Sequence, residues 1–259
     1  MTSAKPDALE RWNDLCACIS ASGVAVFLDY DGTLTPIAPR PELAVLSPSM
    51  RSTLRLVAKH WPTAIVTGRS LDQIQRLVDL SGLTYAASHG FDIHGPGLQY
   101  QVGRNARNAI HAACFDITQK IADVEGVLIE NKTFSVAVHF RLVAPENTQR
   151  VIDATRSTGL HHRLRVTGGK QVIELRPDID WDKGAAIRWL AGRHPGRIPL
   201  FIGDDLTDED GFRAIADNGI SILVAAEPRE TAARFTLRDV DAVETFLQLL
   251  CRIPAEPDR

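Results

Sequence analysis

The chain has 259 residues, of which 44% are hydrophobic and 24% are charged, a composition typical of a globular protein with a buried core in one large or two small domains. Lys and Arg number 29 and Asp and Glu number 32, for a formal net charge of −3. No general attraction to nucleic acid is therefore expected. Purely apolar runs such as Val24–Leu28 are far shorter than the ~20 residues that cross a bilayer, so we expect no membrane helix.

The first residues and the cysteines bear on the cellular compartment. The opening stretch, MTSAKPDALE, has no basic segment leading into an apolar one, which favours a cytoplasmic protein over an exported one. The four cysteines are scattered, and only Cys16 and Cys18 lie close together. Neither a disulfide framework nor a zinc site is expected from that spacing.

Short apolar runs that end in Asp, Gly or Thr alternate with helical patterns in both outer parts of the chain. This alternation is typical of an α/β protein whose parallel sheet is buried on both faces and joined by crossover helices. The expected strands are Val24–Leu28, Thr63–Val66, Tyr85–Ala87, Leu200–Ile202 and Ser221–Val224, and the expected helices are Ser47–His60, Ser70–Asp79, Asp182–Arg193, Asp208–Ala216 and Val240–Cys251. Residues Ala8 to Ile19 are a further candidate for an amphipathic helix.

The middle of the chain has a different pattern. Residues Lys132–Arg141 alternate between apolar and polar side chains, as in a strand with one covered and one open face. A helical stretch from Pro145 to about Ser157 follows, and then two strand-like pieces, Leu164–Thr167 and Gln171–Leu175, separated by a turn at Gly168-Gly169. Residues from about 98 to 176 are therefore predicted to form a small α+β domain inserted into the α/β one.

Two carboxylates follow the first predicted strand directly. Asp29 and Asp31 are two residues apart, so they point the same way while the chain stays extended, and Gly32 allows a sharp turn immediately after them. In an open α/β sheet, ligands bind at the carboxyl ends of the strands. The pair is therefore predicted to face a binding site.

A second acidic cluster, Asp204 to Asp210, follows another apolar strand. If the two strand ends lie side by side, the repulsion between like charges costs several kcal/mol unless a cation offsets it. A set of hard oxygen ligands favours Mg²⁺ over zinc. A magnesium site is the resulting hypothesis.

Two further elements suit a phosphate group. Thr67, Gly68 and Arg69 leave a predicted strand and lead into a helix, where a hydroxyl and free backbone N–H groups favour an anion. Lys183 stands in the first turn of a predicted helix, a position that the helix dipole disfavours for a cation. A nearby anion would explain the lysine.

These motifs, in this order, resemble the haloacid-dehalogenase-type phosphohydrolases and, within them, the family of trehalose-6-phosphate phosphatases. The similarity covers nearly the full chain. The segments that carry it are Leu28–Ile37, Val66–Arg69, His89-Gly90, Gly169-Lys170, Glu174–Pro177, Trp181–Gly184 and Gly203–Asp210. The resemblance implies a Rossmann-like core built from residues 1–97 and 182–259, with an inserted α+β cap at residues 98–181.

The same resemblance implies a two-step phosphoryl transfer. Asp29 would attack phosphorus to give an aspartyl-phosphate, while Asp31 would protonate the leaving oxygen and then activate water. Thr67, the Gly68 amide and Lys183 would hold the phosphoryl oxygens, and Arg69 would bind substrate. The Mg²⁺ ligands would be Asp29, the backbone carbonyl of Asp31, Asp204 and Asp208, with Asp205 as an alternative to Asp208.

In the predicted cap, Lys132, Arg141, Lys170 and Glu174 match positions that grip the sugar in the resembled family. The implied substrate is trehalose 6-phosphate, with a functional link to a trehalose-6-phosphate synthase and no nucleic-acid or membrane partner. The residues themselves leave alternatives open. These are a solvated sheet face with ion pairs, a phosphatase for sucrose, mannosyl-type or hexose phosphates, a mutase of the phosphomannomutase type, and a non-catalytic sugar-phosphate sensor.

Overall fold

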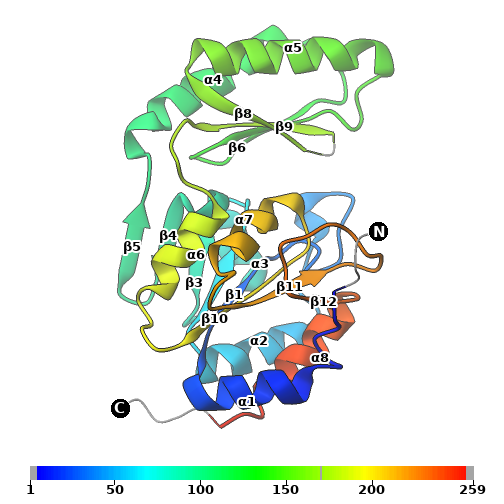
Figure 1. Cartoon of the computed structure of the whole chain (residues 1–259). Helices are drawn as coiled ribbons and strands as arrows, with labels where there is room; N and C mark the ends of the chain where they lie inside the picture. Colours follow the sequence, from blue (N-terminus) through cyan, green and yellow to red (C-terminus); the bar gives the residue numbers. More distant parts are fainter. Residues whose placement is uncertain (1–4, 170, 255–259) are drawn as a thin grey trace. The chain divides into compact units, whose positions relative to one another are not determined.

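The computed structural model describes residues 5–169 and 171–254 and divides the chain into two compact units (Figure 1). The core unit comprises the residues up to Tyr100 together with those from Trp181 onward. The inserted unit comprises Gln101–Asp180. Among the described residues, none of the helices combines the length and the apolar character needed to cross a membrane.

The core unit is built on a sheet with the strand order β12-β11-β10-β1-β2-β3-β4-β5 across its described residues. Neighbours from β12 to β3 run parallel, and β4 is antiparallel to β3. The strands are β1 (Val24–Leu28), β2 (Thr63–Val66), β3 (Thr84–Ala87), β4 (Asp92–Gly95), β5 (Leu98–Gln101), β10 (Ile198–Gly203), β11 (Ile220–Val224) and β12 (Phe235–Leu237). The expected parallel α/β sheet is confirmed.

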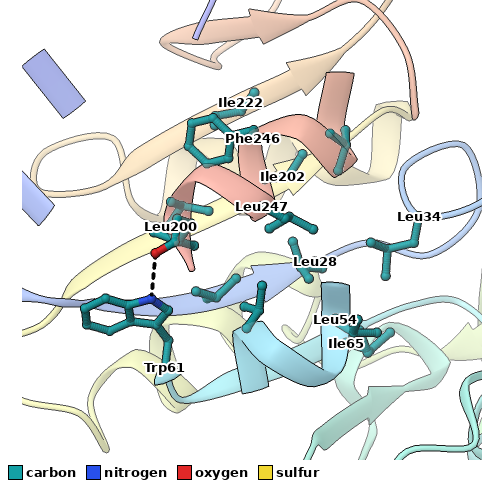
Figure 2. Packing of buried hydrophobic residues seen from close by; sticks show 14 of the residues in the cluster. Leu28, Leu34, Leu54, Trp61, Ile65, Leu200, Ile202, Ile222, Phe246 and Leu247 are labelled. Carbon is teal, nitrogen blue, oxygen red and sulfur yellow. Dashed lines mark hydrogen bonds between the residues drawn. The ribbon is translucent and has the colours of Figure 1, made fainter. Parts of the chain in front are cut away.

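Helices cover both faces of this sheet. One face carries α1 (Trp12–Ser22), α2 (Pro48–His60), α3 (Leu71–Val78) and α8 (Val240–Leu250), and the other carries α6 (Lys183–Ala191) and α7 (Glu209–Ala214). Successive residues of β1 therefore enter opposite cores: Val26 and Leu28 pack on one side and Phe27 on the other. Figure 2 shows the first core, where strand residues meet Leu54 of α2 and Phe246 of α8.

The predicted starts of α2 and α3 are confirmed by their caps. The Ser47 hydroxyl accepts the Met50 N–H at 3.0 Å at the start of α2. Ser70 begins α3 with a capping box that includes the Gln73 side chain. Each cap satisfies an N–H group that the helix itself leaves unbonded.

The inserted unit is an antiparallel sheet in the order β6-β7-β9-β8, covered by two helices (Figure 1). Its elements are α4 (Arg107–Lys120), β6 (Leu128–Asn131), β7 (Val136–His139), α5 (Pro145–His161), β8 (Leu164–Gly169) and β9 (Val172–Pro177). One sheet face supplies Val138 and Leu175 to the core against α4 and α5. The opposite face holds polar residues because side chains alternate along each strand.

Two expected features of this unit are wrong in detail. The stretch from Lys132 to Arg141 is not one strand, because the Lys132 N–H bonds the Ser135 carbonyl at 2.8 Å and closes a turn before β7 begins. The expected turn at Gly168-Gly169 is strand instead, with both glycines paired to β9. Alternating polarity does not show where a hairpin turns, so it could not locate the end of the first strand. A glycine in a strand costs less free energy than a turn that shifts the register of the strands, so both glycines stay paired.

Candidate active site

The two acidic motifs of the sequence meet at the carboxyl ends of β1 and β10. These strands pair in parallel, with Leu28 opposite Ile202, and the Asp29 N–H bonds the Ile202 carbonyl at 2.9 Å. Carboxylate oxygens of Asp29, Asp204 and Asp208 all lie within 4.8 Å of one another. We call these three residues the acidic triad. The sheet thus joins groups that are more than 170 residues apart in the sequence.

A glycine makes room for the triad. Gly32 has φ +84°, and a Cβ at this position would collide with the Asp204 carboxylate. The neighbouring Thr33 hydroxyl donates to Asp204 Oδ1 at 3.2 Å. Both the backbone conformation and the available space therefore require glycine at this turn.

Lys183 is the cation that bonds two members of the triad, Asp29 and Asp208. As the first residue of α6, it is almost fully buried, and its Nζ donates to Asp29 Oδ1 and to Asp208 Oδ1, each at 2.6 Å. Burial alone lowers the pKa of the Lys183 ammonium, but the carboxylates of Asp208 and Asp29 outweigh that effect and raise it above its ordinary value. The lysine is therefore held in its charged form.

The carboxylates carry more charge than one lysine neutralises. Burial raises the pKa of Asp29 well above its ordinary value, against the opposing effect of Lys183. Burial, assisted by the charge of Asp208, raises the pKa of Asp204 to about 7. Three acids around one ammonium form a hard, oxygen-rich and anionic donor set, which fits a divalent cation of the Mg²⁺ type.

Asp208 also organises the loop after β10. Its Oδ2 accepts the N–H groups of Asp204 and Asp205 at 3.0 and 2.9 Å, while its Oδ1 accepts from Lys183. The Asp205 side chain instead caps the following 3-10 turn by accepting the Leu206 N–H at 2.7 Å. The triad therefore includes Asp208 rather than Asp205.

Asp31 and Arg69 form a separate pair. The Arg69 guanidinium donates from Nε to Asp31 Oδ2 at 2.7 Å and from Nη2 to Asp31 Oδ1 at 2.6 Å. Arg69 is buried, whereas the Asp31 side chain is 41% exposed. This two-point bond holds the Asp31 carboxylate away from the triad and toward solvent.

Thr67 and Gly68 form the turn after β2. The Thr67 hydroxyl accepts the Arg69 N–H at 3.2 Å, and its carbonyl accepts the His89 N–H at 2.8 Å. A Cβ on Gly68 would lie 2.8 Å from the His89 ring, so the imidazole covers this glycine. His89 itself has φ +57° and is buried. The loop after β3 therefore adds a histidine beside the predicted phosphate turn.

The inserted unit brings only some of its predicted residues together. Lys132 Nζ lies 3.6 Å from Glu174 Oε1, on the polar face of the sheet. Arg141 does not join this group and donates to Gln171 Oε1 at 3.2 Å. Lys170 lies outside the described residues. Glu174 has two further partners: Arg176 Nε at 3.5 Å, two residues away on the same face of the strand, and the Ser135 hydroxyl at 2.7 Å, which spacing did not predict.

Arg229 is a residue that sequence reasoning missed. It follows β11, and its Nη2 donates to the backbone carbonyls of Asp204 and Asp205 at 3.0 and 3.3 Å. The available signal was its place just beyond a buried strand, at the same sheet edge as the acidic motifs. A single arginine in a loop is too common to stand out by itself.

A parallel sheet with two acids after its first strand, a hydroxyl after the second, a lysine at a helix start and a further acidic loop defines a hydrolase of the haloacid-dehalogenase type. The fold agrees with a crystal structure described as a trehalose-6-phosphate phosphatase related protein. The two have a TM-score of 0.78 and 28% sequence identity, over 88% of this chain and 96% of the other.

The trehalose-phosphatase family model matches residues 27–241. A maize protein named trehalose 6-phosphate phosphatase RA3 is 39% identical, over 95% of this chain and 74% of the relative. An Arabidopsis thaliana protein named probable trehalose-phosphate phosphatase D is 37% identical, over 95% of this chain and 72% of the relative. The chain belongs to the trehalose-phosphatase family and is a phosphoric monoester hydrolase.

Proposed function

We propose that this chain hydrolyses trehalose 6-phosphate to trehalose and phosphate, with Mg²⁺ at the acidic triad and Asp29 as the nucleophile. The observation that carries the proposal is the arrangement of Asp29, Asp204, Asp208 and Lys183, whose carboxylate and ammonium groups meet at the end of β1. Family membership and the names of the relatives supply the sugar. A functional link to a trehalose-6-phosphate synthase stays a prediction.

Asp29 is suited to attack because one of its oxygens is already held. Oδ1 is bonded to Lys183, which leaves Oδ2 to form a bond to phosphorus as the bond from phosphorus to the sugar oxygen breaks. The product of this step is an aspartyl-phosphate and a free sugar. In the second step, a water oxygen bonds phosphorus, the bond to Asp29 breaks, and phosphate is released.

Asp31 handles the protons in this scheme. It gives a proton to the departing sugar oxygen and later takes one from the attacking water, so it ends in its starting state. Arg69 donates to both oxygens of Asp31 and so fixes the orientation of its carboxylate. That pair has to open before Asp31 can serve as the acid.

The remaining residues orient the phosphoryl group. The Thr67 hydroxyl and the Gly68 amide, in the turn after β2, and Lys183, at the start of α6, provide donors for the anionic oxygens. Asp29, Asp204, Asp208 and the Asp31 carbonyl would hold Mg²⁺, which would supply further positive charge to the phosphoryl group. Most of the catalytic effect then comes from positioning and electrostatics.

The polar face of the inserted unit is proposed to recognise the sugar. Lys132 and Glu174 lie close together there, and we retain Arg141 and Lys170 as further contacts. A disaccharide needs both donors and acceptors for its hydroxyl groups, and this set offers three cations and one carboxylate. Glu174 is already held by three neighbours, so its carboxylate is fixed in orientation before substrate arrives.

The test is phosphate release from trehalose 6-phosphate, sucrose 6-phosphate, glucose 6-phosphate and mannose 6-phosphate, each with Mg²⁺, with EDTA and with Asp29→Asn. We expect selective turnover of trehalose 6-phosphate that both EDTA and the substitution abolish. Preference for another sugar would overturn the role of the inserted unit alone. No turnover of any sugar phosphate would overturn the catalytic proposal and favour a sugar-phosphate sensor.

A further inference from the structure

The loop that carries Asp204 is held from two sides. Inside the protein, the Asp208 carboxylate accepts the N–H groups of Asp204 and Asp205. On the other side, Arg229 Nη2 donates to the carbonyls of the same two residues at 3.0 and 3.3 Å. The peptide group between Asp204 and Asp205 is therefore bonded at both its carbonyl and its N–H.

Arg229 is in turn fixed by a buried carboxylate. Its Nη1 lies 3.5 Å from Glu209 Oε1, and the Glu209 side chain is only 8% exposed. Glu209 is itself anchored because its Oε2 accepts the Ala232 N–H at 2.8 Å. Two hydrogen-bonded steps and one ion pair thus connect the Ala232 backbone, through Glu209 and Arg229, to the backbone of Asp204.

We infer that Arg229 is a positioning residue that sets the backbone of Asp204 for binding the divalent cation. The inference rests on the proposed function, in which Asp204 is a ligand of that cation. An Asp carboxylate pivots about its own Cα, so a backbone held at both peptide groups keeps its oxygens aimed at one point. Replacing an outer residue that orients a metal ligand typically costs 10- to 100-fold in metal affinity or activity.

The test compares Arg229→Met with Arg213→Met, measured as Mg²⁺ binding to the metal-free protein by calorimetry. Arg213 is a matched control, since its guanidinium bonds Asp210 on its own helix, 3.1 Å away, and is 64% exposed. We expect Arg229→Met to weaken Mg²⁺ binding by about 10-fold or more, with less than a twofold change for Arg213→Met. The kcat of Arg229→Met is expected to recover at saturating Mg²⁺, which loss of folded protein would not allow.

Two further variants keep the inference testable if Arg229→Met folds poorly. Glu209→Gln keeps an acceptor for the Ala232 N–H but removes the charge that holds Arg229, and it should weaken Mg²⁺ binding in the same direction. Arg229→Lys keeps the charge but has one nitrogen for the two carbonyls and for Glu209, where arginine uses Nη2 and Nη1, so it should restore part of the affinity.

Unchanged Mg²⁺ affinity in Arg229→Met and Glu209→Gln would overturn the inference and leave the proposed function intact. Asp204→Asn, measured alongside, tests the proposed function separately. If that substitution does not weaken Mg²⁺ binding, the acidic triad is not the metal site, and both ideas fail together.

Discussion

The sheets of the two units place their polar groups by different rules. In the core unit, β1 and β11 are buried along their whole length, so charged residues occur only where the strands end. In the inserted unit, β9 alternates between buried and partly exposed residues, so polar side chains such as Glu174 and Arg176 recur along one face. The first rule concentrates charge at one edge of a sheet, and the second spreads it over a surface.

This difference separates the residues that can be substituted from those that cannot. Asp29, Asp208 and Lys183 of the core unit are buried and share partners, so removing any one of them leaves the others uncompensated. Polar groups in the inserted unit can be exchanged while its apolar face and α4 and α5 stay as they are. A family that catalyses one reaction on several sugars would be expected to vary the polar groups of the inserted unit and to keep the buried charged groups of the core unit.

The comparison is tested most strongly by removing the buried ammonium. Lys183→Met leaves Asp29 and Asp208 without their shared cation, and we expect the metal-free protein to lose about 3–5 kcal/mol of stability, together with nearly all activity. Urea unfolding in EDTA measures the stability. A loss below about 1 kcal/mol would show that the core charges are no more tightly coupled than surface ones.

A pair of glycines gives the next largest contrast. Gly32→Ala combines a left-handed φ with a collision against Asp204, and we expect a loss of about 2–4 kcal/mol and a strong fall in activity. Gly168→Ala, in the inserted unit, meets nothing within 4 Å of its new Cβ and should change stability by less than about 1 kcal/mol. Thermal melts of the two variants side by side check this, and equal losses would contradict it.

The pH dependence of stability sharpens the same contrast. The pKa of Asp204 in the folded state is raised to about 7 from 3.8. The stability that this carboxyl group contributes to the folded state is therefore fully present below pH 3.8 and is lost as pH rises through about 7. Asp204→Asn does not titrate and should keep the Thr33 bond. In EDTA, we therefore expect the stability of Asp204→Asn relative to the wild type to rise between pH 4 and pH 8, by on the order of 1 kcal/mol. Tm values of both proteins across this pH range measure the change. A fall in the stability of Asp204→Asn relative to the wild type with rising pH would refute the prediction.

The smallest effect on stability is expected at the polar face of the inserted unit. Lys132 and Glu174 are partly exposed to solvent and 3.6 Å apart, so Lys132→Met should cost no more than about 1 kcal/mol. If the face recognises sugar, KM for trehalose 6-phosphate should rise while kcat changes less. Steady-state kinetics beside a thermal melt separate the two effects. An unchanged KM would remove Lys132 from the sugar site.

Sequence patterns were sufficient for the part of the molecule where burial is complete. The apolar runs before Asp29 and Asp204 mark strands, and parallel pairing brings their ends together, so the acidic site could be predicted without coordinates. The Asp31–Arg69 pair and the bonds of Arg229 could not, because they depend on loop conformations that no periodicity specifies. The helix α4 was missed because its apolar residues do not fall on a single stripe.

The inserted unit was harder to predict for a related reason. Its alternating pattern runs on through the turn from Lys132 to Ser135, so one strand was expected where the structure has the end of a hairpin loop. The grouping around Glu174 joins residues from a turn and two strand positions, which depends on the register between β7, β9 and β8. Register is set by packing between strands rather than by any one of them.

The order of strands also has a consequence for synthesis of the protein. Strand β1 has β10 as one neighbour, yet Gly203 leaves the ribosome 175 residues after Leu28, an interval of about 10–35 s at typical rates of translation. During that interval Asp29 has been made but Asp204 and Asp208 have not, and Lys183 is added only in its last part; the contiguous inserted unit is complete before β10 begins. The acidic triad therefore cannot assemble until Asp208 has been made, after synthesis of the whole inserted unit.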